Sequence, residues 1–472
     1  MLVCIGFLAF IIGACTPPTP APTQTQATKP SLYPPIDRTR LLTNQEMETL
    51  ADPGAPTEPL DVRTWIQGNH YTIRSLVVDN NFADLQFFKQ FLGSKRLVQL
   101  GESGHGVREF NMAKTRLIKF LHEEMGYDVI AFESSLFDCY DADQRATSFS
   151  TPLEMMQSSI FAVWSTIEVE ELFRYIRSTK NTPRPLILAG FDSQRSAGRD
   201  PLRRSRFFRN VLRGVDSGFA ERAEVHDSSF ISLLTTVTSL AASEAAIKRI
   251  QTEEKSWIAM YDSIAQFCEQ HKGRITAQAN GNAVLPLFVA QCARSGREYV
   301  RQYANADNLS VGIPIRDKAM AENIDFLLKT MYADKKIIVW AHNFHIRHAN
   351  SQTTTNNEAG VKTQGEFLVE LGRRSDMYTI GLIGYRGQAA TNNRQLYSFS
   401  AATLGSIESI AYNARKHYMF FDMTSQERTS ATSWMFEKRV YKEWGVNPML
   451  GIWRDQYDGF LYVDAVNPPS YY

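Results

Sequence analysis

The chain has 472 residues, of which 43% are hydrophobic and 21% are charged, and its formal net charge at pH 7 is +1. This composition is typical of a globular protein with a large core. The nearly balanced charge provides no overall attraction to nucleic acid or to membranes, so no nucleic-acid partner is expected.

The first 15 residues predict a lipoprotein signal peptide. Leu2 to Ala14 is almost wholly apolar, but the run is shorter than the roughly 20 apolar residues that cross a bilayer. It ends in IGAC, which resembles the bacterial lipobox, in which the cysteine, here Cys15, is lipidated and becomes the first mature residue. No Lys or Arg precedes the apolar run, so an uncleaved or simple secretory leader stays open.

Residues 16–35 predict a tether between the lipid anchor and a folded domain over residues 36–472. The segment is rich in Pro and Thr, a composition that forms semi-rigid linkers and builds no core. Thr16 follows the cysteine where inner-membrane retention would need Asp. By resemblance to lipoprotein sorting, we expect a protein of the bacterial cell envelope, anchored in the outer membrane and facing the periplasm.

Apolar strands alternate with amphipathic helices along the remaining chain. Expected helices cover residues 82–92, 107–125 and 164–177, and expected strands cover 96–100, 127–132, 185–191, 336–341, 377–385, 418–422 and 459–463. This alternation predicts an α/β fold with a largely parallel or mixed central sheet flanked by helices. From about residue 195 to 315 the strand pattern disappears, which indicates a helical insertion that forms a cap subdomain.

Three cysteines remain beyond Cys15 in the expected folded domain, namely Cys139, Cys268 and Cys292. In an oxidising compartment one disulfide could form, and Cys268 with Cys292 is the pairing we suggest. The cysteine spacings match no zinc-binding motif.

Ionisable side chains follow four of the expected strands directly. They are Glu102 and His105 after the first strand, Glu133 after the second, Asp192 after the third, and His342 and His345, with Asn343 between them, after the fourth. In open α/β sheets, ligands bind beyond the carboxyl ends of the strands. We therefore expect these groups to converge in one pocket, although Asp192 could instead act as a helix N-cap.

Three chemistries could use such a pocket. GESGH resembles the serine-hydrolase elbow G-x-S-x-G, but His105 replaces the last glycine, so we reject Ser103 as a nucleophile. Glu102, His105, His342 and His345 could instead bind a divalent metal such as Zn or Mn. In the third chemistry, His105 acts as general base on a water molecule, neighbouring carboxylates orient its ring, and another histidine stabilises the oxyanion.

Five segments of the chain carry a family resemblance: GESGHGVREF, AFESS, AGFDSQ, IRDKAMAENIDFLL and VWAHNFHI. Together they resemble the erythromycin esterase family, whose members open the macrolactone ring of macrolide antibiotics by ester hydrolysis. The resemblance extends over about residues 65–466 and implies an α/β core with a helical insertion. It also implies that His105 is the general base, that Glu102 and Glu133 are its carboxylate partners, and that His342 and His345 position substrate or water.

The chain departs from the family pattern where studied esterases place an active-site Arg, because Lys114 stands there. Asp317 matches the pattern, and we interpret it as the cap of the following helix. Lys114, Asp192 and Asn343 are the expected substrate contacts.

The expected activity is hydrolysis of carboxylic esters or lactones of small molecules, with no cofactor. Two alternatives stay open. One is a divalent-metal-dependent hydrolase of the wider superfamily that shares the G-x-x-H signature. The other is a non-catalytic lipoprotein that binds haem or metal.

Overall fold

The computed structural model describes residues 58–196, 199–235, 240–353 and 360–472. The predicted signal peptide, Cys15 and the linker of residues 16–35 lie outside these ranges. None of the described helices is both long and apolar enough to cross a membrane.

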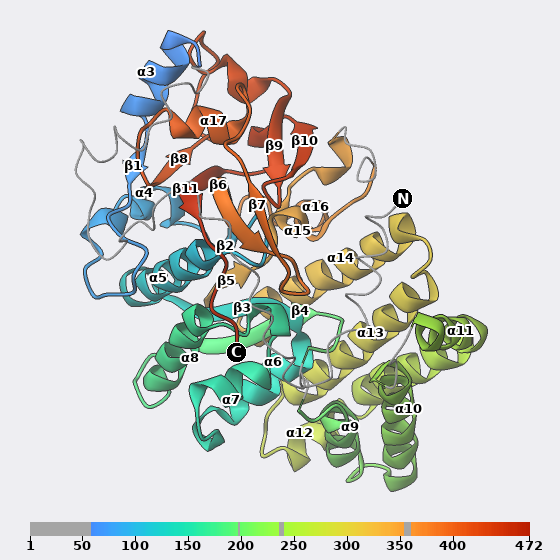
Figure 1. Ribbon diagram of the computed structural model, residues 1–472. Helices are drawn as coiled ribbons and strands as arrows, with labels where there is room; N and C mark the ends of the chain where they lie inside the picture. The colour runs from blue at the N-terminus through green and yellow to red at the C-terminus, as the bar shows by residue number, and fades with distance from the viewer. Residues whose placement is uncertain (1–57, 197–198, 236–239, 354–359) are drawn as a thin grey trace, which may run out of the picture.

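A mixed nine-stranded sheet forms the centre of the molecule (Figure 1). Its strand order is β1-β8-β11-β6-β2-β5-β3-β4, and β7 pairs with β6. The six strands from β11 to β4 run parallel, whereas β1, β7 and β8 pair antiparallel. The strands are β1 (Tyr71–Thr72), β2 (Leu97–Leu100), β3 (Tyr127–Ser135), β4 (Ile187–Asp192), β5 (Lys336–Trp340), β6 (Met377–Ala390), β7 (Leu396–Phe399), β8 (Tyr418–Asp422) and β11 (Gly459–Val466). The predicted α/β class and largely parallel sheet are confirmed.

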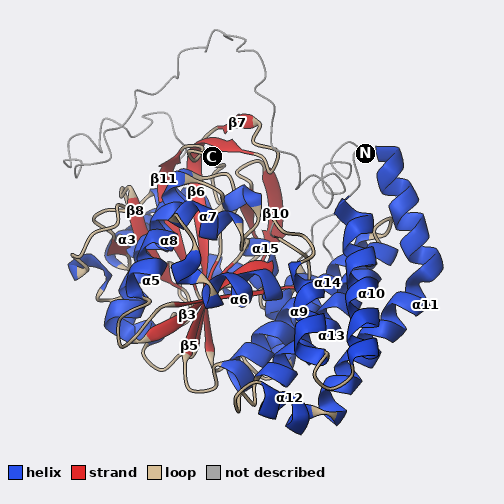
Figure 2. Cartoon of the chain, turned by 90° about the horizontal axis from the view of Figure 1, so that it is seen from below, coloured by secondary structure: helices blue, strands red, loops and turns tan. Residues whose placement is uncertain are grey.

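Helices cover both faces of this sheet, as Figure 2 shows. Side chains alternate between the faces along each strand: Leu97 belongs to one buried core and Val98 to the other. The helices are α3 (Leu60–Gly68), α4 (Phe88–Leu92), α5 (Arg108–Met125), α6 (Leu136–Gln144), α7 (Pro152–Gln157), α8 (Ile167–Thr179), α14 (Leu309–Phe326), α15 (Asn343–Ile346), α16 (Gln364–Glu370) and α17 (Ile407–Tyr412). The core packed under α5 and α8 contains Phe110 and Leu172, and the core on the other face contains Met320 of α14.

The helical insertion is also confirmed. Helices occupy the described chain between β4 and α14, and no strand occurs there: α9 (Arg203–Leu212), α10 (Ser217–Thr235), α11 (Leu240–Gln270), α12 (Lys272–Gln278) and α13 (Leu285–Ala304). Figure 1 shows them stacked beside the β4 edge of the sheet. α11 packs along α13, and α13 packs on α14, which in turn contacts β4.

Two local expectations were less accurate. The helix expected over residues 82–92 is a 3₁₀ turn (Ala83–Leu85) followed by the short α4. The predicted disulfide is wrong, because Cys268 and Cys292 are free thiols, as is Cys139, and all three are buried. Burial in apolar surroundings raises the pKa of all three thiols, so they act as core side chains.

A second, two-stranded sheet was not predicted. It is the hairpin of β9 (Arg439–Glu443) and β10 (Asn447–Gly451), which pair antiparallel. Glu408 of α17 holds this hairpin, because its Oε1 accepts a hydrogen bond of 2.7 Å from the backbone N–H of Lys442. Glu408 is 1% exposed, and burial raises the pKa of its carboxyl from 4.5 to about 7 despite the backbone hydrogen bond.

Replacing Glu408 with Gln is expected to change how stability depends on pH. A carboxyl with a raised pKa binds its proton more tightly in the folded state, so its contribution to stability falls as the pH rises from about 4.5 through about 7. Across this pH range the carboxyl of Glu408 loses a contribution of about 3 kcal/mol to the free energy of unfolding. In urea unfolding, the free energies of the wild type and Glu408→Gln should therefore diverge between pH 5 and pH 8, with the variant favoured at pH 8. Parallel curves across this range would contradict the interpretation.

Candidate active site

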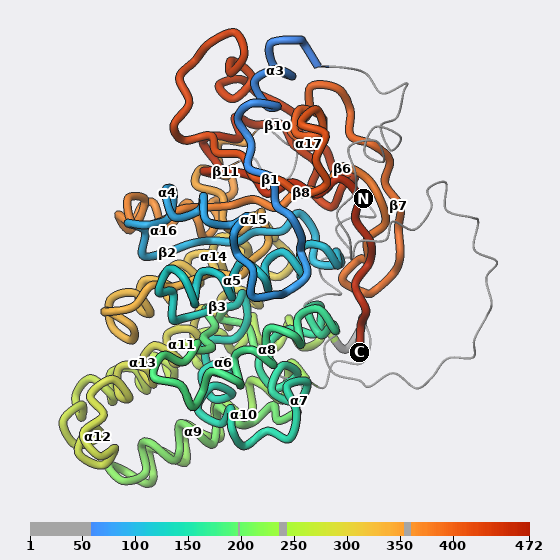
Figure 3. Tube along the Cα trace, turned by 90° about the vertical axis from the view of Figure 1, so that its left-hand side faces the viewer, coloured from blue at the N-terminus to red at the C-terminus, as the bar shows by residue number. Residues whose placement is uncertain are grey.

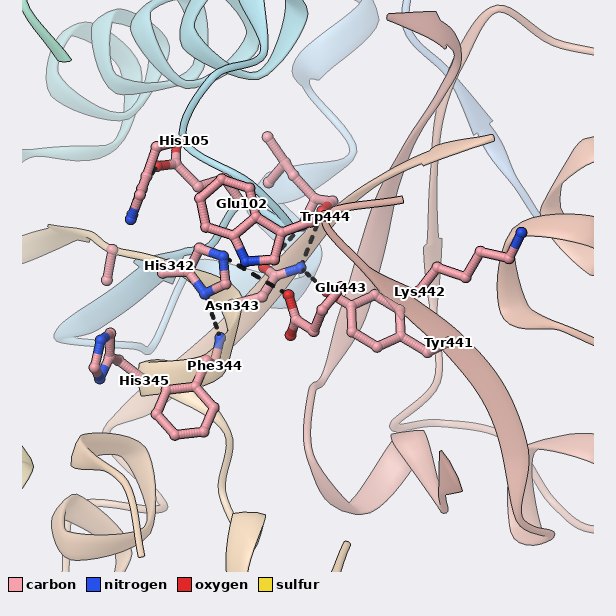
Figure 4. A network of polar contacts seen from close by, with 12 residues as sticks. Glu102, His105, His342, Asn343, Phe344, His345, Tyr441, Lys442, Glu443 and Trp444 are labelled. Atoms are coloured by element: carbon pink, nitrogen blue, oxygen red, sulfur yellow. Dashed lines mark hydrogen bonds and ion pairs between the residues drawn. The ribbon is translucent and has the colours of Figure 1, made fainter. Parts of the chain in front are cut away.

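The carboxyl ends of β2, β3, β4 and β5 bring the predicted ionisable residues together at one edge of the sheet. These four strands are parallel. Glu102 and His105 follow β2, Glu133 lies near the end of β3, and His342 and His345 follow β5. The expected convergence is thus observed, and Figure 4 shows part of it.

Glu102 lies beneath His105 and fixes its ring. The side chain of Glu102 is fully buried, and its Oε1 accepts hydrogen bonds from Trp164 Nε1 at 2.7 Å and from His105 Nδ1 at 2.6 Å. Its Oε2 accepts a third from Lys114 Nζ at 2.6 Å. Because this network makes both carboxylate oxygens acceptors, the proton of a neutral His105 resides on Nδ1. Its Nε2 therefore carries a lone pair.

Lys114 does not lie where a substrate could contact it, contrary to the prediction. Its side chain is fully buried below Glu102, and its ammonium group also donates to Ala341 O at 3.2 Å and lies 4.3 Å from the centre of the Trp340 ring. Burial lowers the pKa of Lys114 to about 8, and the neighbouring Glu102 opposes that shift. Lys114 therefore supports Glu102 from below.

Arg316 bridges two carboxylates near the ends of β3 and β4. Its Nη2 donates to Glu133 Oε1 at 2.9 Å, and its Nε donates to Asp192 Oδ2 at 3.1 Å. Glu133 Oε2 accepts from the backbone N–H of His342 at 2.9 Å. Burial alone would raise the pKa of Glu133, but His345 and Arg316 lower it to about 2.

Asp192 is 1% exposed and holds Arg316, so the predicted substrate contact is wrong for this residue. The alternative N-cap role is also wrong. Its Oδ1 accepts from the backbone N–H of Gln194 at 3.0 Å in a turn, and the next helix, α9, begins only at Arg203.

His345 is placed between two carboxylates. Its Nδ1 lies 2.7 Å from Asp317 Oδ1, and its Nε2 lies 3.2 Å from Glu133 Oε1. Burial lowers the pKa of His345, but Asp317 and Glu133 outweigh that effect and raise it. Asp317 lies within α14 and does not cap its start, which corrects the prediction; its Oδ1 instead accepts from the backbone N–H of Gln364, the first residue of α16.

Replacing Asp317 with Asn is expected to lower the pH at which His345 loses its second proton, because one of the two carboxylates that stabilise the imidazolium disappears. The titration can be followed by NMR of the histidine ring protons. Asp325→Asn on the same helix is the matched control, since Asp325 pairs with Arg373 and Lys329 away from the histidines. An unchanged His345 titration in Asp317→Asn would contradict the assignment.

His342 has the opposite tautomer to His105. Its Nδ1 accepts a hydrogen bond of 3.2 Å from the backbone N–H of Phe344, so Nε2 carries the proton. That Nε2 is buried and has no hydrogen-bond partner among the described residues; Glu443 Oε2 lies 3.7 Å away. Burial and the neighbouring His105 hold the pKa of His342 well below 6.5, so the ring stays a neutral N–H donor.

Asn343 is a structural residue, which corrects its predicted role as a substrate contact. Its Nδ2 donates to Leu382 O at 3.0 Å and to Tyr441 Oη at 2.7 Å, and its Oδ1 accepts from Leu382 N at 3.2 Å. It is fully buried against Gly101, where an added Cβ would lie 2.0 Å from Asn343 Oδ1. The first glycine of GESGHG therefore makes room for this amide.

Sequence reasoning missed four residues of the site: Trp164, Arg316, Glu443 and Trp444. Arg316 stands inside the quoted segment IRDKAMAENIDFLL, beside Asp317, and could have been found there. Trp164 lies at the start of an expected helix. Glu443 and Trp444 fall in a hairpin for which the sequence provided no signal.

The alternative metal site is not assembled. Within the described ranges, no group of three or more His, Cys, Asp or Glu side chains is placed to hold a metal ion. The contacts agree: both carboxylate oxygens of Glu102 already accept hydrogen bonds, and the ring nitrogens of His345 face Asp317, Glu133 and the guanidinium of Arg316. The four proposed ligands therefore do not point at a common centre.

The arrangement can transfer a proton and stabilise a negative charge at adjacent positions. The rings of His105 and His342 lie 4.9 Å apart between centroids. One offers the lone pair of Nε2, and the other offers an N–H donor that makes no hydrogen bond with the described residues and has Glu443 Oε2 3.7 Å away. Such a pair can deprotonate water and donate to a carbonyl oxygen.

Several known proteins are similar to this chain in sequence or in fold. The sequence model of the erythromycin esterase family matches residues 122–466. The Bacillus subtilis (strain 168) protein named "Putative hydrolase YbfO" is 29% identical over 421 residues, covering 86% of this chain and 91% of its own. Erythromycin esterase type II of Escherichia coli is 21% identical over 306 residues, covering 60% of this chain and 68% of its own. A solved structure of a mutant of erythromycin esterase EreC in its open conformation has a TM-score of 0.64 at 15% identity, covering 85% of this chain and 98% of that one.

Proposed function

The chain belongs to the erythromycin esterase family, and from this premise we propose that it hydrolyses carboxylic esters or lactones with water activated by His105. One observation carries the proposal. The hydrogen bond of 2.6 Å from His105 Nδ1 to Glu102 fixes the ring with its Nε2 lone pair available, next to the N–H of His342.

In the proposed reaction, water oxygen forms a bond to the ester carbonyl carbon while His105 Nε2 takes one of its protons. The carbonyl oxygen becomes an oxyanion, which accepts a hydrogen bond from His342 Nε2. Collapse of this intermediate restores the carbonyl and breaks the bond to the alcohol oxygen. The proton on His105 then passes to that oxygen, so the products are a carboxylic acid and an alcohol, or one hydroxy acid from a lactone.

Glu102 has two roles in this scheme. It selects the tautomer of His105 that exposes the Nε2 lone pair, and its negative charge stabilises the imidazolium that forms when the proton arrives. Glu133 contributes a second negative charge nearby and holds the backbone of His342 through the 2.9 Å hydrogen bond. His345 and Arg316 position Glu133.

The charges of the site favour a neutral substrate. Lys114 and Arg316 are bound by Glu102, Glu133 and Asp192, and Asp317 lies close by. Because carboxylates already bind both of these cations, neither is available to an anionic phosphoester. A carboxylic ester or lactone carries no such charge, and the name of the Escherichia coli relative, an erythromycin esterase, supports this class of substrate.

The proposal is tested by incubating the full chain with a macrolactone, with simple p-nitrophenyl carboxylic esters and with bis-p-nitrophenyl phosphate, each with and without a chelator. We expect hydrolysis of at least one carboxylic ester or lactone in the presence of chelator and none of the phosphodiester. Failure on every ester would contradict the proposal. Activity that chelator abolishes and Zn or Mn restores would favour a metal-dependent reaction instead.

A further inference from the structure

Trp444 lies at the tip of the β9–β10 hairpin and packs directly on the two histidines (Figure 4). Its indole stacks on His342 with ring centroids 5.3 Å apart and an interplanar angle of 28°, and it meets His105 edge-on at 5.5 Å. On the same side it covers Gly104, where an added Cβ would lie 3.0 Å from Trp444 Cε3. A side chain from a distant hairpin therefore forms one wall of the site.

The backbone of Trp444 adopts a conformation that its side chain disfavours. Its φ is +56°, and the φ of the next residue, Gly445, is +70°. Two consecutive residues with positive φ in a hairpin turn favour Asn-Gly, because a bulky side chain is strained in the left-handed region. Strain of this kind persists only where the surroundings enforce it, and it concentrates at functional sites.

Several contacts enforce this position. The backbone N–H of Trp444 donates to Ser103 O at 2.6 Å, and its carbonyl accepts from Tyr397 Oη at 2.8 Å. The first bond connects the hairpin tip to the turn that carries Glu102 and His105. Figure 3 shows β7, which carries Tyr397, beside its antiparallel partner β6. With the indole in place, His105 is only 8% exposed and His342 only 6%.

We propose that Trp444 is a positioning and specificity-determining residue for the hydrolysis. It holds the imidazoles of His105 and His342 in their mutual orientation and shields them from bulk water. Trp444 is only partly buried, and its exposed face receives an apolar part of the ester beside the reacting carbonyl. This inference rests on the proposed function, and it predicts a preference for esters with an extended apolar acyl group.

Trp444→Asn separates a structural from a functional role, because Asn suits the left-handed conformation but has no ring. We expect its melting temperature to equal or exceed that of the wild type. We also expect the ratio of kcat/KM for p-nitrophenyl octanoate to that for p-nitrophenyl acetate to fall about tenfold or more. Trp444→Phe, which keeps an aromatic ring, should retain part of the ratio. Val446→Ala, at an exposed position in the same turn, is the matched control and should leave both quantities unchanged.

A second readout does not require activity. Carbethoxylation of His105 and His342 by diethyl pyrocarbonate, mapped by mass spectrometry, should be faster in Trp444→Asn than in the wild type. An unchanged rate of carbethoxylation, or an unchanged octanoate-to-acetate ratio of kcat/KM, would overturn the inference. A lowered melting temperature together with an equal loss of kcat/KM for all esters would also overturn it. A wild type that hydrolyses no ester but shows faster carbethoxylation in the variant would reject the proposed function and leave the shielding role supported.

Discussion

Replacing His105 with Ala is expected to lower kcat/KM for ester hydrolysis by roughly 10²–10⁴-fold, the contribution of a general base. The reason is that Nε2 of His105 holds the lone pair that takes the proton from water, and His342, the neighbouring imidazole, presents an N–H instead. His345 cannot substitute either, because its Nδ1 is bound to Asp317 and its Nε2 faces Arg316 and Glu133. Initial rates with p-nitrophenyl esters measure this loss.

The control for this loss is His271→Ala. His271 lies in the helical insertion, between α11 and α12, and its replacement should leave kcat/KM unchanged. Thermal unfolding of both variants shows whether the fold is retained. Activity of His105→Ala equal to that of the wild type would exclude His105 as the base.

The second large effect concerns stability. Glu102→Ala is expected to lower the free energy of unfolding by about 3–5 kcal/mol, because it leaves the buried ammonium group of Lys114 without its carboxylate partner. Trp164 Nε1 and His105 Nδ1 lose their acceptor in the same change. Urea unfolding of Glu102→Ala against the wild type measures this difference.

A double-mutant cycle with Lys114→Met separates stability from catalysis. Glu102→Ala/Lys114→Met removes both charges, so it should recover part of the stability that Glu102→Ala loses. It should not recover activity, because His105 still has no group to orient its ring and stabilise its imidazolium. A Glu102→Ala protein as stable as the wild type, or a double variant with restored kcat/KM, would contradict the assigned role of Glu102.

The strands that carry the site could be predicted from the sequence because they are buried on both faces. The expected strand at residues 96–100 is β2, which is wholly buried, and such strands appear as short apolar runs. A polar residue directly after such a run stands at the carboxyl end of the sheet. This rule placed Glu102, Glu133 and His342 at one edge without any knowledge of strand order.

The direction in which a polar side chain points could not be predicted in the same way. Asp192, Asn343 and Lys114 stand where ligand contacts are common, yet each is buried against another protein group. A strand-end residue can face a ligand or a neighbouring element, and its sequence position is the same in both cases. The partner that decides the outcome, such as Arg316 for Asp192, comes from a distant helix.

The β9–β10 hairpin was missed for a related reason. Its strands are short and only partly buried, and the second contains Pro448, a residue that argues against a strand when only the sequence is known. Trp444 departs from the turn preference that identifies hairpins, because Asn would be expected at its position. The preference for Asn in such a turn fails at the residue whose indole packs on His105 and His342. A functional constraint is expected to override a local preference at such a place.

The central claim is that water activated by His105 attacks the ester directly, and a single-turnover experiment in H₂¹⁸O with enzyme in excess tests it most directly. Mass spectrometry of the quenched reaction should show an acid product with one ¹⁸O atom and protein of unchanged mass at every time point. Protein that gains the mass of the acyl group, on Ser103 or on any other residue, would contradict the claim, and so would the absence of acid product from every ester.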